Sequence, residues 1–152
     1  MRAVLQRVSE AGVSVEGITI GEIQQGLLVL LGIHESDSED QVKWLASKVI
    51  NLRIFEDLQG KMNHSLLEQG GEMLIVSQFT LYGKCEKGRR PGFSSAARPE
   101  ISIPLYEKFI EEVKKLGVVK VATGEFGADM QVSLTNDGPV TLIIDTPKEK
   151  KC

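Results

Sequence analysis

The chain has 152 residues, 41% of them hydrophobic, and a formal net charge of −3 at pH 7. This length predicts a single domain over residues 1–152 that buries about 70% of its unfolded surface, and the negative charge means that any RNA contact must be local. No apolar run approaches the roughly 18 residues of a membrane span, and the charged opening does not resemble a signal peptide, so we expect a soluble cytoplasmic protein without membrane contact.

Three strands are predicted at the start of the chain. Residues 3–15 alternate apolar and polar side chains, which is typical of a half-buried strand. Residues 16–23 are a second short strand between turn glycines. Residues 26–33 form a continuous apolar run of the length expected for a strand buried on both faces.

Two amphipathic helices are predicted further along. Within residues 36–55, apolar side chains recur at helical spacing behind a Ser/Asp capping segment with acids in the first turn. A second apolar stripe covers about 103–116 and ends at Gly117. Between the helices, residues 72–81 have strand character and run into a loop at 83–92 that is rich in Gly, Lys and Arg.

The last third of the chain returns to strand character, with "TNDGPVT" (135–141) as a turn between alternating runs and a frayed tail at 146–152. The predicted order is three strands, a helix, a strand, a helix and three strands. Because this order has too few helices for a doubly wound sheet, it predicts an α+β fold. We expect a sandwich or partly closed barrel with two main helices packed outside.

Side chains for the common catalytic chemistries are scarce. His34 and His64 have no Cys/His/carboxylate spacing typical of a zinc site, and neither lies near a nucleophile motif such as GxSxG. No metal, no cofactor and no Ser-His-Asp triad are therefore expected. Cys85 lies in a basic loop and Cys152 is the last residue; both are expected to be free thiols.

Two polar clusters interrupt the strand pattern. Ser77, Gln78 and Thr80 end an apolar strand, with Phe79 among them, and "NDGPVT" (136–141) is the second cluster. On spacing alone each is an ordinary strand end or turn, because such side chains commonly satisfy local backbone groups.

The loop at 84–90 carries a local excess of positive charge. By itself this is most simply a solvated surface, although it is the natural candidate for phosphate contacts if RNA binds. Its cations are Lys84, Lys87, Arg89 and Arg90, against Glu86.

Several segments together resemble the D-aminoacyl-tRNA deacylase family, also called D-tyrosyl-tRNA deacylase or DTD. The two most specific are "VSQFTL" (76–81) and "NDGPVT", accompanied by "GEFGADMQVSL" (124–134), "GLLVLLGI", "LRIF" with "GKMN", and "RPGFSSAA". The similarity covers residues 1–145. It implies the single-domain DTD-like fold and a homodimer with active sites at the interface. It also implies hydrolysis of the ester joining a D-amino acid to the 3′-terminal adenosine of tRNA.

The resemblance implies a role for each cluster. It makes 77–80 the catalytic segment, whose backbone N–H groups stabilise an oxyanion. Thr80 is expected to orient the reacting groups, because no His or Lys is placed to activate it as a nucleophile. The adjacent ribose 2′-hydroxyl is expected to contribute to proton transfer.

Chiral selection is implied to come from the Gly138–Pro139 bond, expected to be cis and to enter the active site of the other subunit. There it would exclude an L side chain and accept a D side chain or a hydrogen, so glycyl-tRNA is also at risk. Arg7 is implied to help hold this loop, and Asn136 to belong with it to the residues of substrate binding and chiral selection. Phe126 and Met130 are implied to contact the adenosine. Arg7 as an ordinary surface residue, and Phe126 and Met130 as core residues, remain alternatives.

Two other functions remain open from the sequence. Cys85 could be a thiol nucleophile assisted by the neighbouring cations. Alternatively, the protein could be a non-catalytic module that binds tRNA acceptor ends through the basic loop and Phe126.

Overall fold

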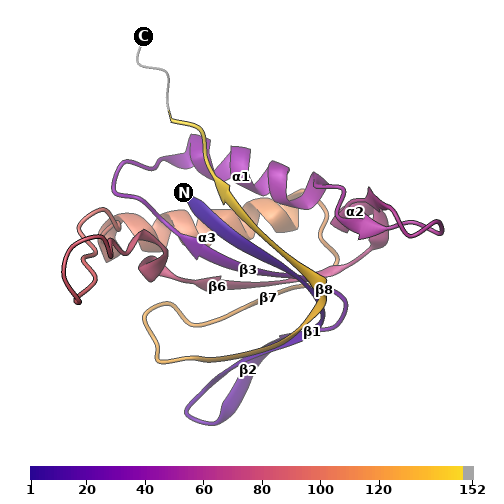
Figure 1. Ribbon diagram of the computed structural model, residues 1–152, viewed down its shortest axis with the longest axis horizontal. Helices are drawn as coiled ribbons and strands as arrows, with labels where there is room; N and C mark the ends of the chain where they lie inside the picture. The colour runs from indigo at the N-terminus through magenta and orange to yellow at the C-terminus, as the bar shows by residue number, and fades with distance from the viewer. Residues whose placement is uncertain (149–152) are drawn as a thin grey trace.

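A strongly curved six-stranded sheet, with helices packed against one face, forms the body of the molecule (Figure 1). The computed structural model describes residues 1–148. The sheet curls so far that β2 comes back beside β6 and β7, which makes it nearly a closed barrel. The predicted α+β fold with a partly closed barrel and outer helices is thereby confirmed.

The first strand organises the sheet. Strand β1 (Arg2–Val15) pairs along its first half with β3 (Gly26–Gly32) and along its second half with β2 (Ile18–Ile23). Both pairings are antiparallel, and the two-residue connection between β1 and β2 permits only this direction for that pair. The opposite edge of β1 pairs with β8 (Gln131–Asp145).

Two parallel strands extend the sheet beyond β3. Strand β6 (Glu72–Ser77) pairs with β3, and β7 (Val121–Thr123) pairs with β6. Parallel neighbours require long crossover connections, and here these contain α1 (Glu39–Asn51) and α3 (Pro99–Lys115). Helix α3 begins about four residues earlier than predicted, because Pro99 suits the first turn of a helix.

The buried side chains form two clusters, one on each face of the sheet. Alternate residues of β3 enter different clusters: Leu27, Val29 and Leu31 face α1 and α3, whereas Leu28 faces the barrel interior. This explains why the run at 26–33 is apolar without interruption, as expected for a strand covered on both sides. Among residues 1–148, no helix is long and apolar enough to cross a membrane.

Four short elements were not predicted, because none is long enough to show a hydrophobic period. They are β4 (Phe55–Glu56), β5 (Met62–His64), α2 (Leu66–Gln69) and the 3₁₀ turn η1 (Phe79–Tyr82).

The prediction of three strands in the last third, with a reversing turn at 135–141, is wrong. Strand β8 continues in one direction: residues 131–136 pair with 8–14 of β1, and 141–145 pair with 2–6. Only the segment 137–140 lacks a partner on β1. Because both alternating halves fit one long partner strand, the polar residues between them form a bulge instead of a turn.

The end of β8 is also held by the start of the chain. The Thr146 amide donates to the carbonyl oxygen of Met1 at 2.9 Å. Thr146, the first residue of the predicted frayed tail, is therefore held and extends the contact between the first and last strands of the chain. Cys152 and the rest of the predicted tail beyond 148 lie outside the described residues.

Candidate active site

The chain leaves the sheet at the carboxyl end of β6. The amide of Gln78 donates to the carbonyl oxygen of Leu31 at 2.8 Å, and η1 then turns across the end of β3. Gly32 permits this crossing, since a Cβ there would lie 3.2 Å from the Gln78 carbonyl oxygen.

Two backbone donors are available at the start of η1. The first hydrogen bond of this turn joins the Leu81 amide to the Gln78 carbonyl oxygen at 3.2 Å. The amides of Phe79 and Thr80 precede it, and they have no acceptor among the described residues, as is usual for the opening amides of a helix. The side-chain amide of Gln78 donates to Thr80 Oγ1, which fixes the hydroxyl beside these donors.

A cavity of about 590 Å³ adjoins this turn. It lies between η1, the loop before α3 and the loop before β8, and most of its wall is apolar. The wall includes Phe79, Phe93, Phe126, Met130, Ser77 and Gln78. The structure thus brings Ser77, Gln78 and Phe79 of the predicted segment together with Phe126 and Met130, whereas Thr80 does not line the cavity.

Phe126 and Met130 belong to both the cavity wall and the core. Phe126 packs against the helix-side cluster, and its ring centroid lies 5.7 Å from that of Tyr106. The Tyr106 hydroxyl donates to the carbonyl oxygen of Ile75 at 3.0 Å, and burial raises the pKa of Tyr106 to about 12. The buried, neutral Tyr106 on α3 therefore supports both the ring of Phe126 and the C-terminal part of strand β6.

The bulge at 137–140 is held by two side chains. Arg7 is only 5% exposed; its Nε donates to the carbonyl oxygen of Asp137 at 2.8 Å, and its Nη1 donates to that of Ile54 at 2.7 Å. Asn136 Oδ1 accepts the amide of Val140 at 2.7 Å. Arg7 is therefore a buried support of this segment and not an ordinary surface arginine.

Gly138 and Pro139 are exposed at the tip of the bulge, and the peptide bond between them is cis. Neither these two residues nor Arg7 and Asn136 line the cavity beside η1. The structure therefore separates the predicted site residues of one chain into two groups.

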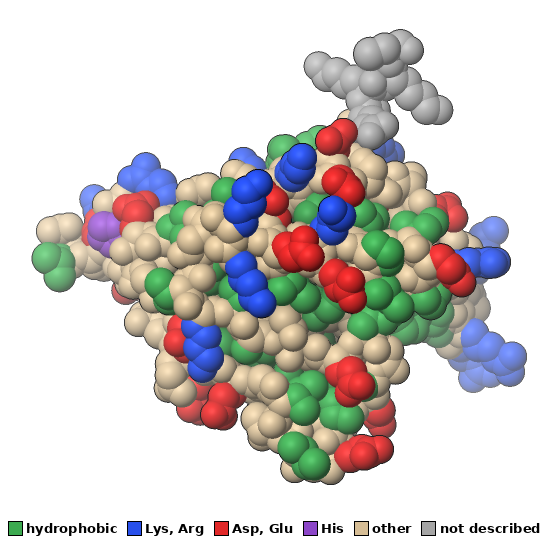
Figure 2. All heavy atoms as spheres, turned by 180° about the vertical axis from the view of Figure 1, so that it is seen from behind, with side chains coloured by type: hydrophobic (Ala, Val, Ile, Leu, Met, Phe, Trp, Pro, Cys, Tyr) green, Lys and Arg blue, Asp and Glu red, His purple; other side chains and the backbone are tan. Residues whose placement is uncertain are grey.

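The basic loop projects from the edge of the molecule. Lys84 and Gly92 exchange both backbone hydrogen bonds, at 2.7 and 2.9 Å, so the loop between them is closed at its base. All of its cations are exposed, namely Lys84, Lys87, Arg89 and Arg90. Lys and Arg side chains gather at the edge from which the loop projects, on the right in Figure 2.

Sequence reasoning did not assign Phe93 to the site. Its ring lies edge-to-face with that of Phe79, with centroids 5.2 Å apart. The signals in the sequence were an aromatic residue after a basic, Gly-rich loop and its place in the "RPGFSSAA" segment, and neither distinguishes a binding residue from a loop anchor.

The other candidates for chemistry lie away from the cavity. Cys85 is exposed in the basic loop, and His34 bonds Ser36 through Nδ1 at 2.8 Å. Neither residue, nor His64, lines the cavity. Within residues 1–148 there is no group of three or more His, Cys, Asp or Glu side chains that could hold a metal ion.

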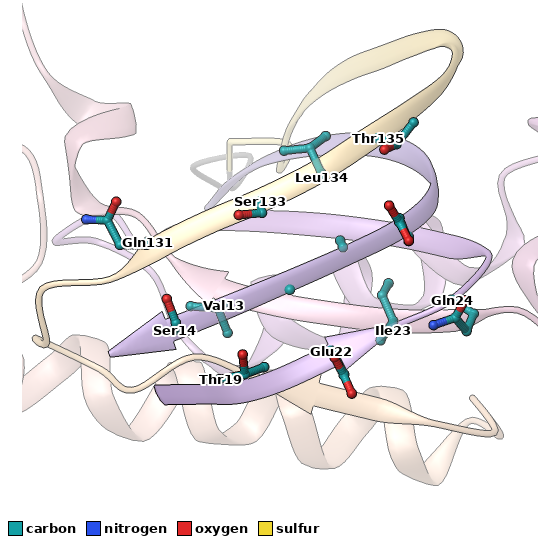
Figure 3. A pocket seen from close by; sticks show the side chains of 13 residues that line it. Val13, Ser14, Thr19, Glu22, Ile23, Gln24, Gln131, Ser133, Leu134 and Thr135 are labelled. Carbon is teal, nitrogen blue, oxygen red and sulfur yellow. The ribbon is translucent and has the colours of Figure 1, made fainter. Parts of the chain in front are cut away.

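A second hollow, of about 310 Å³, lies between β1, β2 and β8 (Figure 3). Its side chains come from three neighbouring strands and are mainly polar, among them Ser14, Thr19, Glu22, Gln131 and Ser133. It contains no histidine, cysteine or cation that could activate a nucleophile.

Comparisons with known proteins agree over nearly the whole chain. A family model described as D-Tyr-tRNA(Tyr) deacylase matches residues 4–145. A D-aminoacyl-tRNA deacylase of Desulfotalea psychrophila is 60% identical over 97% of this chain and 99% of its own length. One from Thermosipho africanus is 61% identical with the same coverage.

Solved structures have the same fold. One described as c-Myc DNA unwinding element binding protein has a TM-score of 0.92 at 41% identity, covering 97% of this chain and 100% of that one. A probable eukaryotic D-amino acid tRNA deacylase has a TM-score of 0.82 at 20% identity, covering 94% and 97%, and this similarity supports the fold alone.

Proposed function

The chain belongs to the D-Tyr-tRNA(Tyr) deacylase family, and on this basis we propose how its two groups of site residues divide the work. The protein is a hydrolase that cleaves D-aminoacyl-tRNA into free tRNA and a D-amino acid. The observation that carries the proposal is the pair of free amides, on Phe79 and Thr80, at the start of a turn that contributes Phe79 to the wall of an apolar cavity.

The cavity beside η1 binds the 3′-terminal adenosine of the substrate. Its volume of about 590 Å³ falls in the range of small-ligand sites. Phe126 and Met130 supply apolar surface for the base, and Tyr106 behind Phe126 keeps that ring in position. Binding the adenosine here presents the ester to the amides of η1.

Hydrolysis relies on position and on backbone donors. The aminoacyl ester is already activated, and attack by water develops a negative charge on its carbonyl oxygen. The two free amides of η1 stabilise that oxyanion; a single such donor is worth about 10²- to 10³-fold in rate. Thr80 Oγ1, fixed by the side chain of Gln78, orients the reacting groups. The ribose 2′-hydroxyl of the substrate takes part in the proton transfer.

Discrimination against L substrates comes from the Gly138–Pro139 bulge of a second copy of the chain. Each tenfold preference requires about 1.36 kcal/mol, and a methylene in a pocket supplies only about 1–3 kcal/mol, so a barrier against the wrong hand is required. The bulge is exposed and does not line the cavity of its own chain. It is also held firmly by Arg7 and Asn136, as such a barrier must be.

A homodimer follows from this arrangement. Strand β8 has no partner on its outer edge within the described chain, and it exposes Leu134, Leu142 and Ile143. These apolar side chains are the surface expected to contact a second copy.

Because the proposed barrier leaves room for a hydrogen in place of a side chain, glycyl-tRNA is hydrolysed as well. The substrate places the enzyme in the cytoplasm.

The test compares purified protein on D-tyrosyl-tRNA and L-tyrosyl-tRNA in the presence of a chelator. We expect hydrolysis of the D substrate only. Equal rates on both substrates, or no hydrolysis of the D substrate, would refute the proposal, and binding without single-turnover cleavage would identify a non-catalytic RNA-binding module instead. Hydrolysis that is insensitive to thiol alkylation would dismiss Cys85 as the nucleophile.

A further inference from the structure

Two aromatic rings stand partly exposed at the rim of the cavity. Phe79 is 57% exposed and Phe93 is 39% exposed, and their rings meet edge-to-face. Single exposed apolar residues are common on protein surfaces. A packed pair at the mouth of a cavity, however, is the kind of surface that binds a ligand.

Phe93 is fixed in this position. A Cβ on Gly83 would lie only 3.1 Å from its Cε1, so the ring packs against the end of η1. Two backbone hydrogen bonds then tie the following residues to the end of β3: the Ala97 amide donates to Ile33 at 2.9 Å, and the Glu35 amide donates to Ser95 at 3.0 Å. The ring is therefore a rigid platform on an anchored segment.

The basic loop begins and ends beside this platform. Gly92, which precedes Phe93, is paired with Lys84 at the closed base of the loop. The surface thus passes from the cavity to the aromatic pair and then to four exposed cations opposed by one acid. Proteins that bind single-stranded nucleic acid combine these two features, because bases stack on aromatic rings and phosphates contact cations.

We propose that Phe93, together with Phe79, stacks the base of the nucleotide that precedes the terminal adenosine, and that the loop at 84–92 contacts the phosphates beyond it. This inference rests on the proposed function, since it requires the adenosine in the cavity. A second copy of the chain would fit this surface less well than the tRNA, because a two-fold contact centred on this rim would bring the cations of both copies together.

The test uses substrates that end at different points. D-tyrosyl-tRNA reaches the platform, whereas 3′-D-tyrosyl-adenosine ends inside the cavity. Phe93→Leu keeps the apolar bulk but removes the aromatic face. We expect it to lower kcat/KM on the tRNA about tenfold more than on the adenosine substrate. Phe93→Trp should restore the rate on tRNA. Ile101→Ala, an exposed apolar residue on α3 away from the cavity wall, is the matched control.

Competition by ligands that carry no amino acid gives a second readout that needs no cleavage of the short substrate. For the wild type, the dinucleotide CpA should inhibit tRNA hydrolysis about tenfold more strongly than adenosine, and Phe93→Leu should abolish this difference. Equal losses on both substrates, or no loss on either, would overturn the inference. A fall in oligomeric mass would show that a second copy covers the ring. Wild-type protein that spares D-tyrosyl-tRNA would instead refute the proposed function.

Discussion

Replacing Gly138 by alanine tests the proposed barrier directly. A Cβ at this position would lie 2.8 Å from both the amide nitrogen and Cγ2 of Val140, and 3.3 Å from Nη2 of Arg7. The Val140 amide is held by Asn136 and cannot simply move away. The residue also has φ of +145°, a conformation that alanine rarely adopts.

The cost of this change is concentrated in the bulge. An unfavourable backbone conformation and an overpacked contact each cost about 1–3 kcal/mol. A domain is stable by about 5–15 kcal/mol, and the bulge is exposed, so we expect it to shift while the rest of the sheet stays folded. A displacement of about 1 Å at a reacting centre costs about 10²-fold in rate. Activity on D-tyrosyl-tRNA should therefore fall about 100-fold.

Three measurements separate this outcome from a general loss of structure. They are kcat/KM for both tyrosyl-tRNAs, the thermal unfolding midpoint, and the oligomeric mass by light scattering. Gly12→Ala is the control, since a Cβ there meets only ordinary contacts at 3.6 Å or more. If Gly138→Ala keeps both its turnover and its preference for the D substrate, the glycine only shapes a bulge and the barrier must lie elsewhere.

Three further changes test other parts of the site. Thr80→Ala should lower hydrolysis about 3- to 20-fold if the hydroxyl orients, whereas complete loss in a stopped-flow single-turnover assay would make it the nucleophile. Tyr106→Phe removes the bond to Ile75 and should cost about 1 kcal/mol in urea unfolding. Because the folded-state pKa of Tyr106 is raised from 10 to about 12, the wild type loses stability as pH rises through this window. The variant should lose less, and an identical pH profile would contradict the assigned burial. Replacing Lys87 and Arg89 by serine should flatten the dependence of log(kcat/KM) on log[salt] by about 0.7 for each phosphate that the loop no longer neutralises, and an unchanged slope would mean that the loop does not bind the tRNA.

Long periodic segments were predictable because their pattern reports burial directly. The run at 26–33 and the helix within 36–55 are present in the fold with the faces that their periods indicate. Strand β8 was not predictable in the same way. Its polar centre has the composition of a turn, and only pairing with β1 on both sides of the segment keeps the chain straight.

The same distinction holds for the site: local pattern predicted its segments, whereas only the tertiary structure shows how they lie relative to one another. The sequence identified 77–80 and 136–141 as polar where strands should continue, and their motifs identified the family. It could not show that Phe126 and Met130 meet the first segment in one cavity, or that the second segment lies outside it. Arg7 and Phe93 illustrate the difficulty. Arg7 bonds Asp137, which is distant in the sequence, and Phe93 lies in an irregular loop where no periodic pattern reports its contacts.

The sequence alone therefore determined the family, the class of fold and the segments that are candidates for the chemistry, because these follow from local pattern and motif. The tertiary structure decided which segments share a cavity, which arginine is buried, and that the Gly138–Pro139 bulge lies outside its own chain's cavity. These outcomes depend on strand register and on the packing of residues far apart in the sequence, and no local pattern encodes the distance between them.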